Sequence, residues 1–230
     1  MASDPITPVA APTRQRLATA VRDRISAGVF EPGARLSERE LCEDFDVSRT
    51  VVRETLRQLE AEGFLTIEPN RGAVVATVSY ADAEQMFELR ESLEALACSL
   101  FAKRGTVEHK KALWEVIDGI EAAIDDGDLT ALIDAKAAFY DVLLVGAGNE
   151  QLTSTLRLLR VRINLLRRYS LSMPERHPET LAEIRAIRDA IIAGDVDGAR
   201  RAGEFHVQQA SRAALPRIFE ELQRTEPTSS

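Results

Sequence analysis

The pattern of apolar and polar positions near the N-terminus predicts a short helix, a tight turn and a second helix. Ser37 and Glu40 form a capping box, so a helix is expected to start there, with Leu41 and Phe45 on its inward side. Asp46 then breaks the helical period. An earlier apolar face, which ends at Gly28, predicts one more helix through Leu17, Ala18, Val21 and Ile25.

The second helix of the pair carries apolar and basic residues on opposite sides. Ser48 is a suitable N-cap, and Gly63 is a suitable end. The inward side repeats Val52, Leu56 and Leu59, and the outward side repeats Arg49, Arg53 and Arg57. Two short helices with arginines in the first turns of the second are typical of a helix-turn-helix, in which the second helix enters a major groove of DNA.

A β-hairpin is expected directly after the second helix. Residues 64–68 and 73–78 are β-prone and flank a turn that runs from Pro69 to Gly72. Because glycine has no side chain, the backbone at the tip can approach a DNA strand closely. The hairpin is therefore predicted to be the wing of a winged helix-turn-helix.

From residue 80 onward the apolar periodicity is helical. Helices are expected at about 80–104, 107–126, 129–146, 150–172, 178–193 and 196–223, with cap or stop signals between them. The predicted fold class is mainly α: a winged helix-turn-helix at residues 14–78 and an antiparallel α-helical bundle at residues 79–224, joined near residues 77–81. Residues 1–13 and 225–230 are expected to be disordered tails.

Composition agrees with this organisation. Of 230 residues, 45% are hydrophobic, 29% are charged and only 5% are aromatic, which favours helices packed through aliphatic side chains. No segment has the pattern of a signal peptide or of a membrane span, so no membrane partner is expected. Cys42 and Cys98 lie inside predicted helices and do not suggest a disulfide framework, which fits a reducing cytoplasm.

The distribution of charge matters more than the net charge of −8. Up to Val78 the chain has 10 Arg and 12 Asp plus Glu, and the rest has 19 basic against 25 acidic residues. The predicted DNA-binding part is thus almost neutral, and modest non-specific affinity that depends on a dimer is expected. The sequence has no nucleophile elbow, phosphate loop, paired catalytic carboxylates or CxxC motif, so an enzyme is not expected.

The chain resembles the GntR family of transcription regulators, and within it the FadR-type subfamily with a C-terminal FCD domain. In the N-terminal part the resemblance rests on Gly28, Pro32-Gly33, Leu36-Ser37-Glu38, Val47-Ser48-Arg49-Thr50, Val52-Arg53-Glu54, Leu56, Leu59, Glu62-Gly63 and Arg71-Gly72. In the helical part it rests on Leu89-Arg90, Leu93-Glu94, Phe139, Leu143, Asn149, Leu152, Ala190, Gly194-Asp195 and His206. The resemblance covers nearly the whole chain after the N-terminal tail.

The resemblance implies a set of DNA-contacting residues. The matching positions are Arg39, Ser48, Arg49, Thr50, Arg53 and, from the wing in the minor groove, Arg71 and Gly72. Spacing alone supports Arg49 and Arg53, which lie one turn apart on an exposed face and can reach base edges or phosphates together. The alternative is a solvated helix face whose arginines pair with acids such as Glu54 or Glu60.

The helical part departs from the metal site of the family. Many FCD domains hold a divalent metal ion with an Asp and a His four residues apart on one helix, plus two His from later helices. The matching residues here are Lys136, Tyr140, Ile184 and His206, of which only His206 is a suitable ligand. His109 and His177 are expected in or near loops, at positions that do not match. We therefore expect no metal cofactor, as in the metal-free members of the subfamily.

Lys136 is expected to face the bundle interior, because it shares a helical face with Ile133, Tyr140 and Leu143. A buried lysine needs an anion, which predicts a small anionic effector held by Lys136. Arg90 matches a family position that often faces the same cavity, and Tyr140 and His206 can add hydrogen bonds. Alternatively, Lys136 reaches the surface or pairs with an internal acid, Arg90 pairs with Glu94, and His206 is a packed core residue.

The leading hypothesis is a homodimeric, ligand-responsive transcription regulator, with repression as the expected mode. One DNA-binding head reads only a few base pairs, so a two-fold dimer on a pseudo-palindromic double-stranded operator is expected. Exposed apolar positions on the early helices of the bundle are expected to form the dimer interface. The alternatives are an architectural DNA-binding protein, which would not need a helical bundle of this size, and a metal-dependent FCD regulator.

Overall fold

The computed structural model describes residues 10–26, 29–30 and 32–225. The chain divides into two compact units, Met1–Thr77 and Val78–Ser230. The division falls in the segment 77–81, where a linker is expected from the sequence. Each unit is described by itself below.

The N-terminal unit is a winged helix-turn-helix, as predicted. Its elements in order are α1 (Ala10–Ser26), β1 (Arg35–Leu36), α2 (Glu38–Phe45), α3 (Arg49–Ala61), β2 (Leu65–Glu68) and β3 (Gly72–Val75). The hydroxyl of Ser37 accepts the backbone N–H of Glu40 at 3.4 Å, and that of Ser48 accepts the N–H of Val51 at 3.4 Å. Asp46 ends α2 in the left-handed conformation, at φ 49°.

The wing is a three-stranded antiparallel sheet in the order β1-β3-β2. In the hairpin, Leu65 is opposite Val75 and Glu68 is opposite Gly72, and Gly72 has a positive φ of 79°. Three expectations need correction. The structure has the two-residue strand β1, the second hairpin strand ends at Val75 and not at residue 78, and α1 starts at Ala10 within the expected tail. The expected helix end at Gly28 lies outside the described residues.

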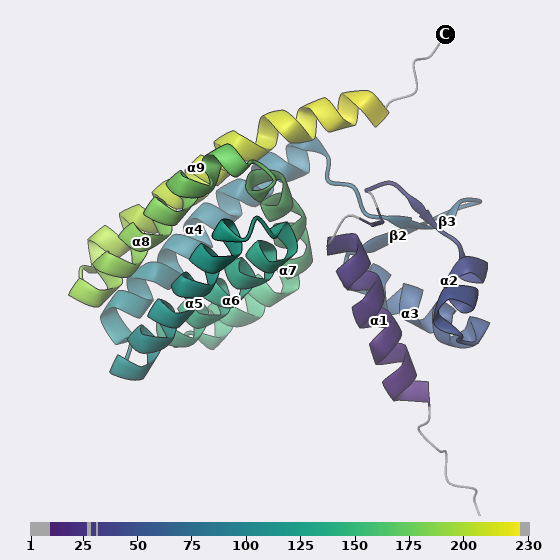
Figure 1. Cartoon of the computed structure of the whole chain (residues 1–230), viewed down its shortest axis with the longest axis horizontal. Coiled ribbons are helices and arrows are strands. Elements are labelled where there is room, and N and C mark those ends of the chain that lie inside the picture. The colour runs from purple at the N-terminus through teal and green to yellow at the C-terminus, as the bar shows by residue number, and fades with distance from the viewer. Residues whose placement is uncertain (1–9, 27–28, 31, 226–230) are drawn as a thin grey trace, which may run out of the picture. The chain divides into compact units, whose positions relative to one another are not determined.

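The C-terminal unit is a helical bundle (Figure 1). Its helices are α4 (Tyr80–Arg104), α5 (Val107–Asp125), α6 (Leu129–Ala147), α7 (Glu150–Leu171), the 3₁₀ helix η1 (Pro174–Arg176), α8 (His177–Ala193) and α9 (Val196–Thr225). His177 is the first residue of α8 and His109 lies in the first turn of α5, so both are near a helix start. Helix α9 includes Thr225, which was expected in the tail. The remaining tail residues, 1–9 and 226–230, are outside the described part.

Helix α4 is the centre of this bundle, because it packs against α6, α7, α8 and α9. Figure 1 shows α9 running alongside α4, with α5 and α6 next to each other. One apolar cluster joins α4, α5, α6 and α8 around Phe101, and a second joins α4, α7 and α9 around Leu166. Within the described residues, no helix combines the length and the apolar character needed to cross a membrane.

We predict that Gly146→Ala destabilises the bundle and that Gly119→Ala does not. A Cβ at Gly146 would lie 2.6 Å from the fully buried ring of Phe101, and overpacking of this kind costs about 1–3 kcal/mol. A Cβ at Gly119, on the exposed side of α5, meets nothing within 4 Å. Because alanine has a higher helix propensity than glycine, Gly119→Ala should raise the free energy of unfolding by about 0.5–1 kcal/mol. Urea denaturation followed by circular dichroism measures both, and equal effects would contradict the packing of α6 on α4.

Candidate functional site

The outer face of α3 presents the residues expected to contact DNA. Val52, Leu56 and Leu59 are buried, whereas Arg49, Thr50 and Arg53 are exposed. The Ser48 hydroxyl caps the helix, so its side chain fixes the start of α3. Arg71 and Gly72 are exposed in the wing. The helix and the hairpin therefore each expose an arginine within a short, rigid element.

Three of the arginines expected to contact DNA form ion pairs with acidic side chains. Arg53 Nε donates to both carboxylate oxygens of Glu38, at 2.9 and 3.1 Å. The other two pairs are Arg39 with Glu43 at 3.4 Å and Arg71 with Glu68 at 2.8 Å. Arg49 makes no ion pair within the described part of the chain. Exposed pairs like these contribute about 0–1 kcal/mol, so DNA phosphates or base edges can replace the acids.

In the alternative interpretation, Glu54 or Glu60 would pair with the arginines of α3, but the structure gives both acids other partners. Glu54 lies 3.7 Å from Arg14 of α1, and Glu60 accepts the backbone N–H of Ile67 in β2 at 3.2 Å. Both acids therefore join α3 to neighbouring elements, and the outward side of its first turns stays free of them.

The helical unit contains a buried group of charged and polar side chains, which we call the buried charge cluster. Its members come from six elements: Arg90 and Glu94 from α4, Lys136 and Tyr140 from α6, Arg167 from α7, Arg176 from η1, Glu183 from α8 and His206 from α9. All are buried except Arg176, whose side chain is 14% exposed. Four basic residues thus share the bundle interior with two carboxylates.

Glu94 organises one half of the cluster. It accepts Arg90 Nε at 2.9 Å, and Arg167 Nη2 lies 3.8 Å away. Arg167 also stacks on the ring of Tyr140, with 3.7 Å between Cζ and the ring centroid. Burial by itself raises the pKa of Glu94, but the charges of Arg90 and Arg167 outweigh it and leave that pKa lowered. Glu94 is therefore ionised at neutral pH.

Glu183 organises the other half. Arg176 donates two hydrogen bonds to its carboxylate, at 2.9 and 3.2 Å. His206 Nδ1 lies 2.6 Å from Glu183 Oε2, and His206 Nε2 lies 2.9 Å from Lys136 Nζ. Since a carboxylate only accepts and an amine can donate, these partners assign the proton of the neutral imidazole to Nδ1. The chain of contacts runs from Arg176 through Glu183 and His206 to Lys136.

The cluster carries excess positive charge. Burial, and then the nearby charge of Lys136, lowers the pKa of His206 to about 4. Burial, followed by the charge of Arg167, also lowers the pKa of Lys136 well below its ordinary value. The arginines stay protonated. Burial raises the pKa of Glu183, but hydrogen bonds from His206 and Arg176 outweigh burial and leave that pKa lowered. Three arginines therefore face two carboxylates even when Lys136 is neutral.

Several buried polar atoms of the cluster lack hydrogen-bond partners. They are Arg90 Nη1, Arg167 Nε, Arg176 Nε, Tyr140 Oη and Glu94 Oε2. The cavity that Arg90, Lys136, Tyr140, Arg167 and His206 help to line has a volume of only about 10 Å³. Most buried polar groups in proteins are paired, so unpaired donors around a cavity indicate a place where a ligand can bind.

The donors present here do not fit a divalent metal ion. Lys136 and Tyr140 replace the expected Asp and His, and Ile184 is fully buried in the apolar core. His206 uses Nε2 for Lys136 and Nδ1 for Glu183, which leaves no ring nitrogen for a metal. In the part of the chain that the structure describes, no group of three or more His, Cys, Asp or Glu could hold one.

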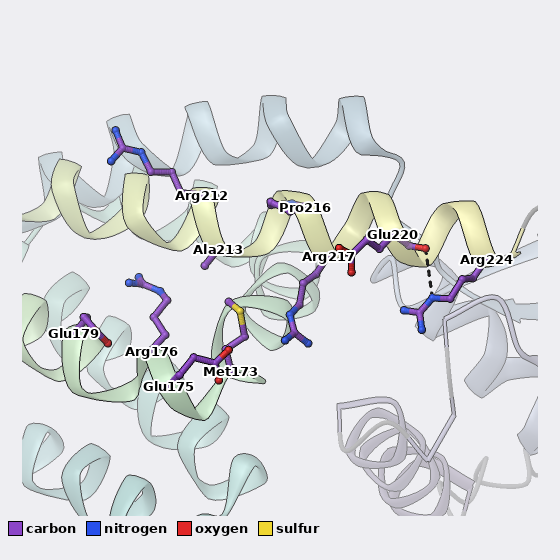
Figure 2. Close-up of a pocket in the computed structure, with 10 residues that line it drawn as sticks. All are labelled: Met173, Glu175, Arg176, Glu179, Arg212, Ala213, Pro216, Arg217, Glu220 and Arg224. Atoms are coloured by element: carbon purple, nitrogen blue, oxygen red, sulfur yellow. Dashed lines mark hydrogen bonds between the residues drawn. The ribbon is translucent and has the colours of Figure 1, made fainter.

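A larger groove opens at the surface between η1, the start of α8 and the second half of α9 (Figure 2). Its volume is about 720 Å³. Its lining residues are Met173, Glu175, Arg176, Glu179, Arg212, Ala213, Pro216, Arg217, Glu220 and Arg224. Figure 2 shows Arg176 extending from η1 toward α9, and Arg217 extending from α9 toward Met173.

Comparison with known families decides what kind of protein carries these features. The family model described as "FCD domain" matches residues 85–209, and the one described as "Bacterial regulatory proteins, gntR family" matches residues 13–75. The chain belongs to the GntR family and carries an FCD domain. It is a transcriptional regulator and not an enzyme, as predicted.

Several known proteins are similar to this GntR regulator over most of its length. An HTH-type transcriptional regulator of Streptomyces ambofaciens is 31% identical over 200 residues, which cover 82% of this chain and 81% of the relative. The HTH-type transcriptional repressor RspR of Escherichia coli is 25% identical over 202 residues, 88% of this chain and 89% of the relative. A GntR regulator structure from Rhodococcus sp. RHA1 has a TM-score of 0.77 at 25% identity, covering 91% of this chain and 98% of that one.

The structure brings the four predicted effector residues, Arg90, Lys136, Tyr140 and His206, to one cavity. It also tests the alternative partners that the sequence left open for Arg90 and Lys136. Arg90 does pair with Glu94, whereas Lys136 neither reaches the surface nor bonds an acid directly, since its partner is His206.

Sequence reasoning missed Arg167, Arg176 and Glu183. Two of them had a usable signal, because Arg167 lies one turn after buried Ile163, and Glu183 lies one turn before buried Ile187. Arg176 lies in a stretch between two prolines that is typical of a helix stop, so nothing in its local sequence indicates that it reaches inward.

We predict that the FCD domain loses stability as pH falls from 7 to 5. The unfolded state binds a proton at His206 with a pKa near 6.5, and the folded state does so only near 4, so stability is full above 6.5 and declines toward 4. Over this pH range the loss is about 2 kcal/mol. Urea titrations followed through the fluorescence of Trp114 in α5 measure it. In His206→Gln the free energy of unfolding should depend much less on pH. The same pH dependence in this variant as in the wild type would contradict a buried neutral His206.

Proposed function

We propose that this GntR regulator is a repressor that binds a pseudo-palindromic operator as a homodimer, and that a small anionic metabolite bound in the FCD domain changes its affinity for DNA. The repressor RspR, similar over most of the chain, supports the assignment of repression. The excess positive charge of the buried charge cluster supports an anionic effector, and it is the single observation on which this proposal depends.

The DNA part of the proposal assigns Arg49 and Arg53 to the major groove. Both are exposed on the outer face of α3, one turn apart. Ser48 and Thr50 start the same helix, Arg39 lies on α2, and Arg71 with Gly72 forms the wing tip, which is proposed to contact the minor groove. A single head covers few base pairs, so two heads related by a two-fold axis give the required specificity.

Dimerisation is proposed to use the early helices of the FCD domain. Large apolar side chains are exposed there, including Leu89 on α4, Val107 and Trp114 on α5, and Val145 on α6. Apolar surface of this kind is typical of protein interfaces when it is contiguous. The proposed dimer would present two operator-binding heads in a symmetric pair.

The effector part assigns Arg90, Lys136, Tyr140 and His206 to ligand binding, and adds Arg167. A carboxylate in this cavity would meet the donors Arg90 Nη1, Arg167 Nε and Tyr140 Oη, and it would compete with Glu94 for Tyr140. It would also offset the excess positive charge, which is costly to leave buried without a counterion. We propose that the site works without a metal cofactor, because its side chains leave no set of ligands for one.

Regulation requires that the effector bind one arrangement of the dimer better than another. A cavity of about 10 Å³ cannot hold a metabolite, so binding must rearrange the helices that enclose it. We propose that this rearrangement is passed through residues 77–81 to the DNA-binding heads and alters their spacing. Couplings of this type change affinity by about 5- to 150-fold.

We predict that Arg49→Ala and Arg53→Ala each weaken operator binding by about 1–3 kcal/mol, because each variant removes a bidentate interaction with a base. Fluorescence anisotropy with an operator selected by the wild-type protein, together with a scrambled duplex, measures the change. Arg57→Ala, in the same helix, serves as the matched control and should change binding less. Light scattering of the complex should give two chains per operator. Wild-type affinity in both variants would show that α3 is not the recognition helix.

We predict that Lys136→Met abolishes the response of operator binding to the anionic effector and leaves operator affinity in its absence unchanged. The variant keeps the length of the side chain but removes the amine that faces the cavity. Lys110→Met is the matched control, since the partly exposed Lys110 of α5 donates to the backbone carbonyl of Ile192 and lines neither the cavity nor the groove among the described residues. Anisotropy titrations with and without effector measure the response. A normal response in Lys136→Met would place the effector elsewhere.

A further inference from the structure

The enclosed cavity raises the question of how an effector reaches it. Its volume of about 10 Å³ is close to that of one water molecule, so the free protein has no open path for a metabolite. The cavity and the surface groove have one lining residue in common, Arg176. This side chain therefore forms part of the boundary between the groove of about 720 Å³ and the buried charge cluster.

Arg176 is held in place by contacts that an incoming anion can replace. Its two hydrogen bonds go to Glu183, at 2.9 and 3.2 Å, and its Nε has no partner. It belongs to η1, a helix of three residues whose N-terminus has no side-chain cap. A carboxylate that replaced Glu183 would keep the guanidinium paired, so the exchange does not leave an isolated cation at any stage.

Helix α9 forms the opposite side of the groove. It is locally weakened there and carries arginines that can attract anions. Pro216 lies inside α9, where a proline cannot donate the usual helical hydrogen bond and so weakens the helix locally. Arg212 and Arg217 lie on either side of it and form no salt bridge with any acid of the described chain. Four arginines and three glutamates line the groove, but Arg176 is paired with Glu183, so the attraction for anions rests on Arg212 and Arg217.

We propose that this groove is the access site for the effector, a small carboxylate, and that Arg176 leaves Glu183 to bind the effector and admit it to the cavity. The inference depends on the proposed function, because it concerns the route to the same effector site. It adds a second anion-binding position at the surface, and it makes Arg176 a ligand-binding residue that also closes the cavity.

The test measures access to the cavity directly and needs no effector. In the full chain, Cys42→Ser removes the half-buried thiol of α2, and Ser170→Cys places a thiol in the cavity wall. The remaining thiol, Cys98, is buried in the core, and burial raises its pKa to about 12, so it serves as a slow internal reference. Two methanethiosulfonate reagents, one with an anionic sulfonate and one with a cationic ammonium, are compared, and mass spectrometry gives the rate constant at each thiol.

Arg176→Ala should raise the rate constant at the introduced thiol by about ten-fold for both reagents, because it opens the wall. Arg185→Ala is the matched control: it breaks an ion pair of 2.7 Å with Glu121, outside the groove, and should leave the rate constant unchanged. In the parent protein the anionic reagent should react faster than the cationic one, and Arg212→Ala combined with Arg217→Ala should reduce that difference. Arg176→Gln, which is less disruptive, should show the same increase if the alanine variant folds poorly.

Equal rate constants in Arg176→Ala and its parent, or the same increase in Arg185→Ala, would overturn the access route. Failure of the proposed function gives a different result. If Arg176→Ala accelerates labelling but no carboxylate, succinate included, slows labelling of the parent, the route stands and the effector assignment fails. If succinate protects the thiol while Arg176→Ala has no effect, the effector site stands and the route fails.

Discussion

Excess positive charge inside the FCD domain is the constraint on which the rest of the structure depends. Glu94 and Glu183 each hold an arginine, and Glu183 also fixes His206, which in turn contacts Lys136. Removing one partner of a buried ion pair typically costs about 3–5 kcal/mol. The contacts of Glu183 and His206 join η1, α8, α9 and α6, whereas Glu94 joins α4 to α7 through Arg167. The two acids cannot neutralise all the basic groups. In the proposed function, an anionic effector would offset the remaining positive charge.

The N-terminal unit also pairs arginines with glutamates, but these pairs are exposed to solvent and therefore contribute less to stability. Arg53 with Glu38 and Arg71 with Glu68 are exposed pairs, and solvent makes them easy to separate. In the proposed mode of DNA binding, phosphates would replace these acids as partners of Arg53 and Arg71. In the bundle, by contrast, several of the paired groups come from different packed elements, so an exchange of partners there would disturb the packing of those elements.

The sequence predicts elements well where the signal is local. The capping residues Ser37 and Ser48 mark helix starts, and both accept a backbone N–H in the structure. Strand β1 has only two residues and forms because β3 lies beside it, which no local pattern indicates. Lys136 is expected inside because apolar residues flank it at helical spacing. Glu183 and His206 could not be paired from sequence, since only the tertiary fold brings α8 and α9 together.

The most direct test of the account is thermal unfolding of the full-length protein with a panel of small carboxylates after exhaustive chelation of metals. Each acid is paired with its neutral amide, for example succinate with succinamide. The account predicts that at least one carboxylate raises the melting temperature, that its amide does not, and that Lys136→Met removes the increase. If no carboxylate stabilises the protein, or if one does so only after a divalent metal is added, a metal-free anion site in the FCD domain is contradicted.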